Sequence, residues 1–371
     1  MEFTLAFQSP EDRALYKLGA LYKAHGYKLY KMSKFEEYDL YLRNKDFLVS
    51  SEIITFTDTT GKLMALKPDV TLSIIKNSSG TEALQKLFYH ENVYRISKGS
   101  QSFKEIMQCG LECIGNIGLY EQFEVLKLAA LSLEKLSAAY VLDVSHLGLI
   151  SALFAAEGVP QGLQKQLMAY LEQKNSHDLQ RLCAAEGLSA AFAATLTGLA
   201  SCSGAADEVL PQLQALSADA AYQAALAELA ALCALLEQAG LGKHINVDFS
   251  IVNDMGYYSG LVFRGYIDGI PGSLLSGGRY DKLMQKMGRS CGAIGFAVYL
   301  DMLELLLQQK PPYEVDVLLT YEAESCLPQL VQQVQKLRDE GCSVLVQRDG
   351  FSCRCRKQLH INAAGEVVER V

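Results

Sequence analysis

Polar side chains interrupt an otherwise apolar stretch of the sequence that begins at Glu105 and has the texture of a β-strand. Gln108, Gly110 and Glu112 occupy alternate positions there, so all three would face the same side of an extended strand. A buried amide or carboxylate without partners would cost several kcal/mol, and a polar ligand on this face would supply those partners. The glycine would leave room for the ligand to approach the backbone. The alternative is an exposed face of a half-buried sheet.

Three further polar residues could contact the same ligand. Arg95 ends the preceding predicted strand, where its planar guanidinium could bind a carboxylate or a phosphate, or form a surface ion pair. Asp69 and Thr71 follow a proline just past another predicted strand. A carboxylate at this place could meet an amino group of the ligand, or it could cap a helix.

Two tyrosines and a glycine pair complete the set of candidate site residues. Tyr257 and Tyr258 are expected in a strand from Met255, in which neighbouring side chains point to opposite faces, so at most one would share a pocket. The segment 277–281 (GGRYD) could form a tight turn. Its two glycines would also let the backbone pass close to a ligand.

The common signatures of catalysis are missing from the sequence, which has no GxxxxGK[ST] phosphate loop, no GxGxxG after a strand, no HExxH and no GxSxG. Cys353 and Cys355 with His360 make only a weak candidate for a metal site, so we predict no metal and no cofactor. The ten cysteines have no framework spacing, which is typical of free thiols in a reducing cytoplasm.

The charge balance argues against nucleic acid as a partner. Lys and Arg number 34 against 42 Asp and Glu, a formal net charge of −8, and a short basic segment occurs only at residues 354–357 (RCRK). Domains that bind RNA usually carry a basic face. The first residues lack a signal-peptide pattern and no run reaches the roughly 18 apolar residues of a membrane span, so we expect a cytoplasmic protein that contacts no membrane.

The elements that must position these residues alternate between hairpins and helices. Ser9–Asp12 has the hydroxyl, proline and acids of a helix start, and Gly26 marks the end of that helix. A hairpin turns at Thr60–Gly61, and a second strand pair carries Arg95 and Gln108. Further predicted elements are a helix at 121–136, strands from residues 139, 244, 255 and 273, and a helix at 296–309.

This order of elements predicts an α+β fold, an antiparallel sheet with flanking helices, rather than a doubly wound parallel sheet. Residues 1–146 and 241–309 would form the core domain. Residues 147–240 are rich in Ala, Leu, Gln and Glu, and the apolar face of 220–240 indicates that they form a helical insertion. After Pro311–Pro312, residues 313–371 would form a small C-terminal α/β unit.

Taken together, these segments resemble the histidyl-tRNA synthetases and their paralogues, within the class II aminoacyl-tRNA synthetases. The resemblance spans about residues 5–309, and the motifs occur in the order that the family has them. The motifs are LKPDVT at 66–71, YR at 94–95 with QCGLE at 108–112, DMGYY at 254–258 with VF at 262–263, and SGGRYD at 276–281 with AIGFA at 293–297.

The resemblance implies a class II synthetase fold with a pocket for histidine. A carboxylate in such a pocket can accept the imidazole N–H. The resemblance assigns the α-amino end of histidine to Asp69, Thr71 and Gln108, the carboxylate to Arg95, and the imidazole to Glu112 and Tyr258, with Tyr257 as a further pocket residue.

Departures from the synthetase motifs indicate that the catalytic function is lost. Asn253 stands where the family has an essential arginine in the histidine-specific loop, and Met302 stands where the third motif has its ATP-binding arginine. Ser97 replaces an acidic residue of the second motif. Since phosphoryl chemistry depends on positioned positive charge, these changes predict that no histidyl-adenylate forms.

A synthetase fold that keeps the histidine pocket and loses the ATP residues resembles the regulatory subunits of ATP phosphoribosyltransferase. That resemblance implies a homodimer, which uses about residues 10–56, and a short-form catalytic subunit as partner in the first step of histidine biosynthesis. It also implies feedback by histidine, and a C-terminal unit that is a truncated anticodon-domain remnant. The alternatives are a divergent histidyl-tRNA synthetase and a histidine-sensing module for another partner.

Overall fold

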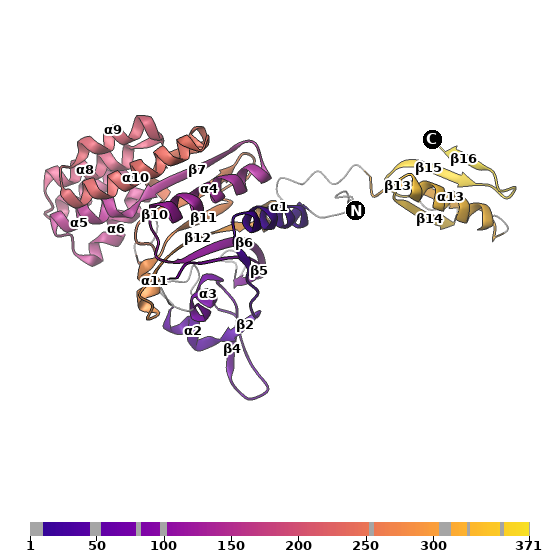
Figure 1. Ribbon diagram of the computed structural model, residues 1–371, viewed down its shortest axis with the longest axis horizontal. Helices are drawn as coiled ribbons and strands as arrows, with labels where there is room; N and C mark the ends of the chain where they lie inside the picture. The colour runs from indigo at the N-terminus through magenta and orange to yellow at the C-terminus, as the bar shows by residue number, and fades with distance from the viewer. Residues whose placement is uncertain are drawn as a thin grey trace. The chain divides into compact units, whose positions relative to one another are not determined.

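The computed structural model describes residues 10–44, 53–78, 83–96, 102–251, 256–303, 313–324, 327–348 and 352–370. The chain divides into two units, Met1–Leu305 and Leu306–Val371 (Figure 1). The first unit contains all the candidate residues for ligand binding, so its sheet is described first.

A nine-stranded sheet forms the centre of the first unit, and its strand order is β1-β5-β6-β12-β11-β10-β7-β9-β8. All neighbouring strands are antiparallel except β1 with β5 and β7 with β9. The predicted α+β fold is therefore confirmed. The strands are β1 (Lys28–Leu29), β5 (Gln85–Ile96), β6 (Phe103–Gly115), β7 (Tyr140–His146), β8 (Ser203–Ala205), β9 (Ile245–Asp248), β10 (Leu261–Ile267), β11 (Leu275–Arg279) and β12 (Gly292–Tyr299).

Two helices cover one face of this sheet. Helix α1 (Pro10–Ala24) begins at the predicted proline and is followed by Gly26, whose φ of 82° is the left-handed conformation that ends helices. Helix α4 (Leu119–Leu136) packs beside α1 and against β7, β10, β11 and β12 (Figure 1). The odd-numbered residues of β6, such as Leu111, are buried in the same apolar cluster as these helices. The even-numbered residues of β6 consequently face the other side of the sheet.

Smaller elements surround that other side. Strands β2 (Phe35–Glu37), β4 (Leu63–Leu66) and β3 (Thr55–Thr57) form a separate antiparallel sheet, and β3 and β4 are the predicted hairpin. Helices α2 (Tyr38–Arg43), α3 (Thr71–Asn77) and α11 (Asp281–Lys286) accompany this sheet, and a second apolar cluster joins them to β5. These elements form a wall around the polar face of β6.

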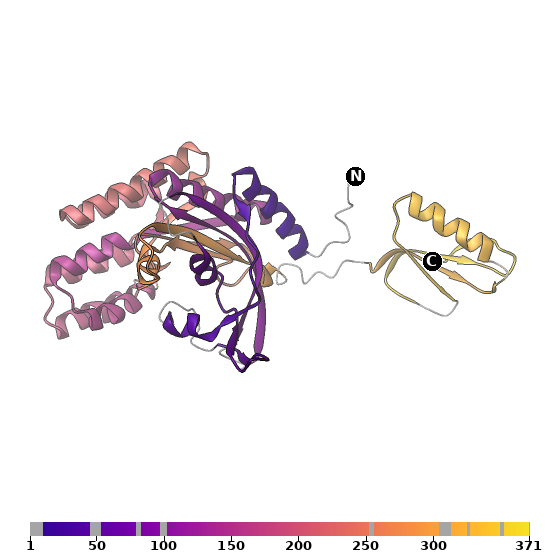
Figure 2. The same cartoon turned by 60° about the horizontal axis from the view of Figure 1, so that its bottom comes forward.

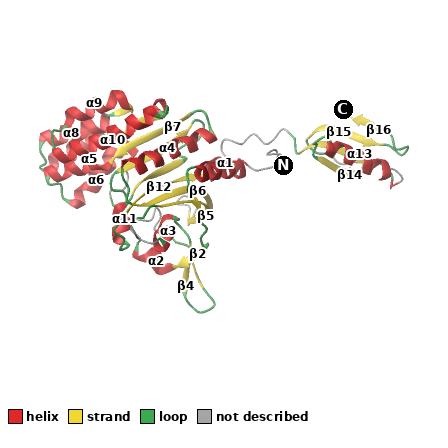
Figure 3. Ribbon diagram, viewed as in Figure 1, coloured by secondary structure: helices red, strands yellow, loops and turns green. Residues whose placement is uncertain are grey.

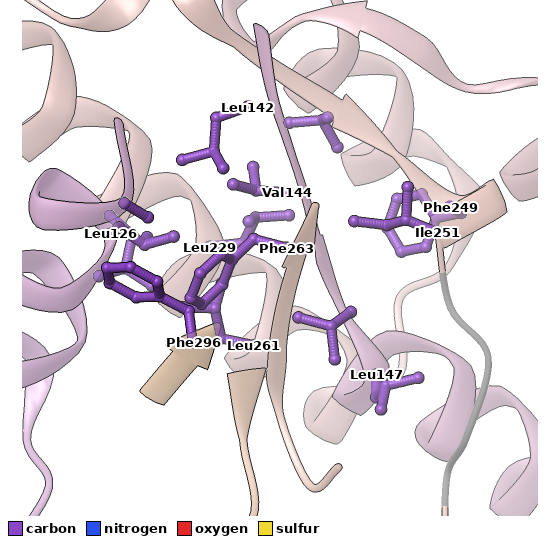
Figure 4. Packing of buried hydrophobic residues seen from close by; sticks show 14 of the residues in the cluster. Leu126, Leu142, Val144, Leu147, Leu229, Phe249, Ile251, Leu261, Phe263 and Phe296 are labelled. Atoms are coloured by element: carbon purple, nitrogen blue, oxygen red, sulfur yellow. The ribbon is translucent and has the colours of Figure 1, made fainter. Parts of the chain in front are cut away.

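The predicted helical insertion lies at one end of the large sheet, where Figure 3 shows its helices grouped together. Helix α10 (Ala220–Gln238) packs against α4, α5 (Leu147–Glu157), α9 (Ala206–Leu216) and β7. Figure 4 shows its Leu229 among Leu126, Val144 and Phe263 of the core. By length and composition α10 could also cross a membrane, but a buried core helix passes the same test. The helices are α5 (Leu147–Glu157), α6 (Gln161–Glu172), α7 (Ser176–Ala185), α8 (Ala190–Ser201), α9 (Ala206–Leu216) and α10 (Ala220–Gln238).

The second unit is a four-stranded sheet with one described helix across it (Figure 2). The strand order is β14-β13-β15-β16, in which β13 is parallel to β14 and β15, and β16 is antiparallel. The last two strands were not predicted. The elements are β13 (Val315–Tyr321), α13 (Leu327–Asp339), β14 (Val344–Arg348), β15 (Cys355–Ile361) and β16 (Val367–Arg370).

One predicted element of the core is wrong. The helix expected from Phe296 is instead the second half of strand β12, which continues into the short 3₁₀ helix η5 (Leu300–Met302). Strand β12 pairs with β6 on one side and β11 on the other, so tertiary pairing outweighs the local helical preference. Residues 304–309 of that prediction lie outside the described residues.

Candidate functional site

A cavity of about 670 Å³ opens on the polar face of the large sheet. That volume falls within the range of about 300–1,000 Å³ that is typical of small-molecule sites. Its floor contains small residues of the central strands, including Ser276, Gly295 and Ala297. Short side chains at these positions leave space directly above the sheet, as a ligand in contact with the backbone would need.

Gln108 and Glu112 both line this cavity from β6. Only 3% and 2% of their surfaces are exposed, so they are buried polar groups rather than the solvated face of a half-buried sheet. Gly110 lies between them, and a side chain added there would collide with the carbonyl of Phe296 and the ring of Tyr89. Sequence alternation thus predicted the common face correctly, but the glycine serves packing of the protein itself.

Two hydroxyl groups hold the carboxylate of Glu112. Thr71 Oγ1 donates to Oε1 at 2.8 Å, and the hydroxyl of Tyr280 donates to Oε2. Burial is the main cause that raises the pKa of Glu112 to about 8, the charge of Asp69 raises it further, and the two hydrogen bonds oppose this. Burial therefore favours the protonated form of this carboxyl group at neutral pH.

Asp69 caps a helix and also lines the cavity. Its Oδ1 accepts a hydrogen bond from the backbone N–H of Leu72 at 2.9 Å, which caps the start of α3, and the residue also lines the cavity. Burial raises the pKa of Asp69 above its usual range, while the Leu72 N–H and the nearby Arg95 lower it. An ammonium group in the cavity would stabilise the ionised form of this carboxylate.

Arg95 lines the cavity near the end of β5. Its Nε donates to the carbonyl of Pro68 at 3.2 Å, so it is attached to the segment that carries Asp69 and Thr71. The cavity thus places the cationic side chain of Arg95 near the acidic side chain of Asp69, an arrangement that suits the separated charges of an amino acid.

Tyr257 and Tyr258 both line the cavity, so the prediction that at most one would do so is wrong. The alternation argument failed because β10 begins only at Leu261 and the tyrosines precede it outside any strand. Their rings lie 4.6 Å apart at 67°, and Tyr257 is 5.9 Å from the ring of Tyr280. The three rings form an aromatic wall.

The segment 277–281 is also not the tight turn that was considered, because residues 275–279 form β11. A side chain at Gly278 would lie 2.6 Å from the ring of Tyr258. Only glycine at this position lets Tyr258 pack directly on the strand. The same segment contains Tyr280, whose hydroxyl group contacts Glu112. No role of its own was predicted for this tyrosine from the sequence.

Arg264 and the Ser276–Tyr299 pair also line the cavity and were not predicted. Ser276 Oγ and the Tyr299 hydroxyl are 2.8 Å apart. Strand alternation could have found Arg264, since it occupies the same face of β10 as Val262, which also lines the cavity.

Met302 lies beside the floor of the cavity, where it can provide no positive charge. Asn253 and Ser97, the other two departures, lie outside the described residues. Among the described residues that line the cavity, the cations are Arg95 and Arg264. The arrangement suits binding of a small zwitterion.

His360, considered above together with Cys353 and Cys355 as a weak metal site, forms hydrogen bonds within the protein. His360 contacts Thr320 Oγ1 through Nδ1 at 2.9 Å and Glu322 through Nε2 at 3.2 Å. In the described part of the chain, no three His, Cys, Asp or Glu side chains group as metal ligands.

A comparison with known protein families assigns the chain. Residues 8–303 match the histidyl-tRNA synthetase family. The chain belongs to this family. The match covers the whole sheet, the insertion and every residue of the cavity, so the resemblance inferred from the motifs is confirmed.

This chain is also similar to curated proteins that are not named as synthetases, over most of the length of those proteins. A protein of Bacillus mycoides (strain KBAB4), named ATP phosphoribosyltransferase regulatory subunit, is 26% identical over 357 residues, which cover 93% of this chain and 82% of that protein. A protein of the same name from Bacillus thuringiensis (strain Al Hakam) is 25% identical over 344 residues, covering 90% of this chain and 79% of that protein.

Solved structures share the fold. An ATP phosphoribosyltransferase regulatory subunit/histidyl-tRNA synthetase from Bacillus halodurans superposes with a TM-score of 0.80 at 22% identity, over 98% of this chain and 100% of that chain. A histidyl-tRNA synthetase from Nostoc sp. PCC 7120 gives 0.76 at 17% identity, over 97% and 93%. A chain of the ATP phosphoribosyl transferase (HisG:HisZ) complex from Thermotoga maritima gives 0.62 at 16% identity, over 81% and 98%.

Proposed function

We propose that this chain is a non-catalytic regulatory subunit of ATP phosphoribosyltransferase, which binds histidine in the cavity and acts on a short-form catalytic subunit in the cytoplasm. One observation carries the proposal. The cavity keeps the complete set of side chains that the family resemblance assigns to histidine, while Met302 lies where the synthetases have a cation for ATP. The names of the curated relatives support this function.

The charges of the cavity suit histidine as the ligand. Asp69 would accept the α-ammonium group, with Thr71 and Gln108 beside it, and Arg95 would bind the α-carboxylate. Glu112 would accept an imidazole N–H, and the aromatic wall of Tyr257, Tyr258 and Tyr280 would enclose the ring. A binding site of this kind regulates a complex if histidine prefers one of its states.

A reconstitution experiment tests the function. The chain is mixed with a short-form catalytic subunit of ATP phosphoribosyltransferase, and phosphoribosyl transfer to ATP is measured with and without histidine. We expect activity only in the mixture and inhibition by histidine. A catalytic subunit that is equally active without this chain would refute the proposal.

We also propose that the chain forms homodimers through the small sheet and the elements beside it. Phe35 and Phe56 are 48% and 39% exposed, and their rings lie 5.7 Å apart in an edge-to-face pair on the solvent side of that sheet. Leu42 and Leu63 are exposed to a similar degree. An apolar surface of this kind is typical of a protein interface.

The proposed domains follow the boundaries drawn from the sequence. Residues 1–146 and 241–309 would be the histidine-binding core, 147–240 the insertion, and 313–371 a remnant of an anticodon-binding domain. Within the described residues, the C-terminal unit has a single α-helix on its sheet. This small size suits a truncated domain that no longer binds tRNA.

A further inference from the structure

Two ion pairs join the helical insertion to strands beside the cavity, and both come from the end of α6. Glu172 is the last residue of that helix, and its Oε1 lies 3.9 Å from a terminal nitrogen of Arg264. Lys174, two residues later, places its Nζ 2.7 Å from Oδ2 of Asp248. We call residues 172–175 the α6–α7 corner.

The first ion pair reaches the cavity itself. Arg264 lines the cavity from β10, directly across from Ser276, which also lines it. The Arg264 side chain is 22% exposed and that of Glu172 is 43% exposed. The pair is therefore loose and partly hydrated, and an anionic group or a change of shape in the cavity could alter it without breaking a buried contact.

The second ion pair ends on Asp248, which precedes a neighbouring part of the cavity wall. Asp248 ends β9, and besides Lys174 it accepts hydrogen bonds from Ser203 Oγ and from the backbone N–H of Ser250, each at 2.7 Å. The bond to Ser250 fixes the start of the 3₁₀ helix η4 (Phe249–Ile251), and Ile251 lines the cavity. Movement of this wall would therefore act directly on the contact with Lys174.

Backbone hydrogen bonds hold the corner to the end of α6, from Lys174 N–H to the Leu171 carbonyl at 3.0 Å and from Asn175 N–H to the Tyr170 carbonyl at 2.9 Å. Lys174 has φ of 51°, and it is the one non-glycine residue with positive φ in the described part of the chain. Such a conformation persists only where the surroundings hold it. Asn175 then caps α7 by accepting a hydrogen bond from the N–H of Asp178 at 3.1 Å. A displacement of the corner would consequently move α7 as well.

We propose that the α6–α7 corner couples the cavity to the helical insertion, so that the insertion changes position or mobility when the cavity is occupied. The identity of the occupant, histidine, rests on the proposed function, whereas the coupling itself rests on the two ion pairs. Because coupling is reciprocal, changes on either side of the corner should affect the other side.

The first arm of the test uses no ligand. Hydrogen exchange of backbone amides is measured in the full-length protein and in Arg264→Gln. Exchange in residues 161–185 should rise by about two- to fivefold, the effect of losing a partly exposed ion pair. Conversely, the double variant Glu172→Gln/Lys174→Gln should raise exchange in residues 245–251 and 261–267.

The matched control is Arg43→Gln. Arg43 forms an exposed ion pair with Asp39 at 3.6 Å within α2, outside the insertion, and it does not line the cavity. Exchange in residues 161–185, 245–251 and 261–267 should match the wild type in this variant. An unchanged insertion in Arg264→Gln, or an equal effect of Arg43→Gln on the insertion, would overturn the proposed coupling.

The second arm adds histidine and follows binding by calorimetry. Histidine should slow exchange at residues 161–185 of the wild type. The Glu172→Gln/Lys174→Gln variant should still bind histidine, within about fivefold of the wild-type affinity, but lose that response. A response of wild-type size in the variant would overturn the inference. If the wild type binds no histidine, the proposed function is wrong, and the ligand-free arm still decides whether the corner couples the two regions.

Discussion

Glu112 is the residue of the proposed ligand site whose environment the fold determines most completely. Its carboxyl group lies 2% exposed on a strand of the central sheet, with hydroxyl donors on both oxygens. Neutral donors orient the group without supplying a positive charge, so burial keeps its pKa high. A ligand that brings an N–H or a positive charge would complete the environment of this carboxylate.

The first prediction concerns the affinity for histidine. Replacement of Glu112 by Ala removes the acceptor for the imidazole N–H, which should cost roughly 1–3 kcal/mol, or about five- to 150-fold in affinity. Calorimetry of both proteins with histidine measures the difference. The control is Glu105→Gln, which changes an exposed carboxylate at the other end of the same strand and should bind like the wild type. Equal affinity in the Glu112 variant would mean that the ligand or the pocket is wrong.

The second prediction follows from the raised pKa of Glu112. The native protein holds a proton on this group up to about pH 8, whereas the unfolded chain releases it near the ordinary value of 4.5. The native state therefore binds more protons between these values, and stability falls as the pH rises. Compared with Glu112→Gln, which cannot titrate, the wild type should lose stability between about pH 5 and about pH 8 and change little above that range.

Urea unfolding of the two proteins across that pH range provides the measurement. All other titrating groups are common to both, so they cancel in the difference. A difference in the free energy of unfolding that stays constant over the range would show that Glu112 is ionised in the folded protein.

Individual site residues were predictable where one strand carried the pattern. Gln108 and Glu112 share a face because alternation is a local property of β6. Tyr257 and Tyr258 were misjudged because the start of β10 depends on its pairing with β7 and β11. Alternation in β10 could have indicated Arg264, but its ion pair with Glu172 of the insertion forms only in the folded chain.

At the scale of elements, helix α10 connects the insertion to the core. Leu229 on this helix is fully buried in the cluster that also contains Leu126 and Phe263 (Figure 4). Replacement by Ala should lower the free energy of unfolding by about 2–5 kcal/mol, through lost burial and the cavity left behind. Urea unfolding measures the change, and Gln238→Ala at the exposed end of the same helix should change it little. A loss below about 1 kcal/mol would mean that the core closes around the shortened side chain.

The small sheet provides a prediction about assembly. If Phe35 and Phe56 lie in a homodimer interface, replacing both by Ser should shift the protein toward monomers, because the interface loses its apolar centre. Light scattering of the wild type and the variant at micromolar concentration measures the mass. Val331→Ser removes another exposed apolar side chain, on α13, and should leave the mass unchanged. A wild-type protein with the mass of a monomer would contradict the proposed interface.

Strand β12 is an element whose type could not be predicted from its own sequence. Its residues GAIGFAVY include small residues on the cavity side, and this pattern does not separate a buried strand from a helix. Its pairing with two neighbouring strands, β6 far away in the sequence and β11 just before it, determines the outcome. The helix predicted at 220–240 agrees with α10 (Ala220–Gln238), because its periodicity is local.

At the scale of the whole molecule, the proposed function means that the chain binds histidine but does not convert it to histidyl-adenylate. Met302 provides no positive charge beside the cavity, and the sequence has Asn253 in place of another essential cation of the synthetases. We predict that the chain catalyses no histidine-dependent exchange between ATP and pyrophosphate, because charge stabilisation of the phosphates is lost. A histidyl-tRNA synthetase serves as the positive control, and exchange above background would favour the alternative of a divergent synthetase.

Strand β8 has a consequence for anyone who wishes to trim this protein. It comes from the insertion, yet its backbone pairs with β9 and forms the outer border of the core sheet. Deletion of residues 147–240 would therefore expose the hydrogen-bonding groups of residues 245–248, and an unprotected sheet edge invites association with other chains. A minimal version of the core would need a short peptide in place of residues 203–205, or charged residues on β9, to remain dispersed in solution.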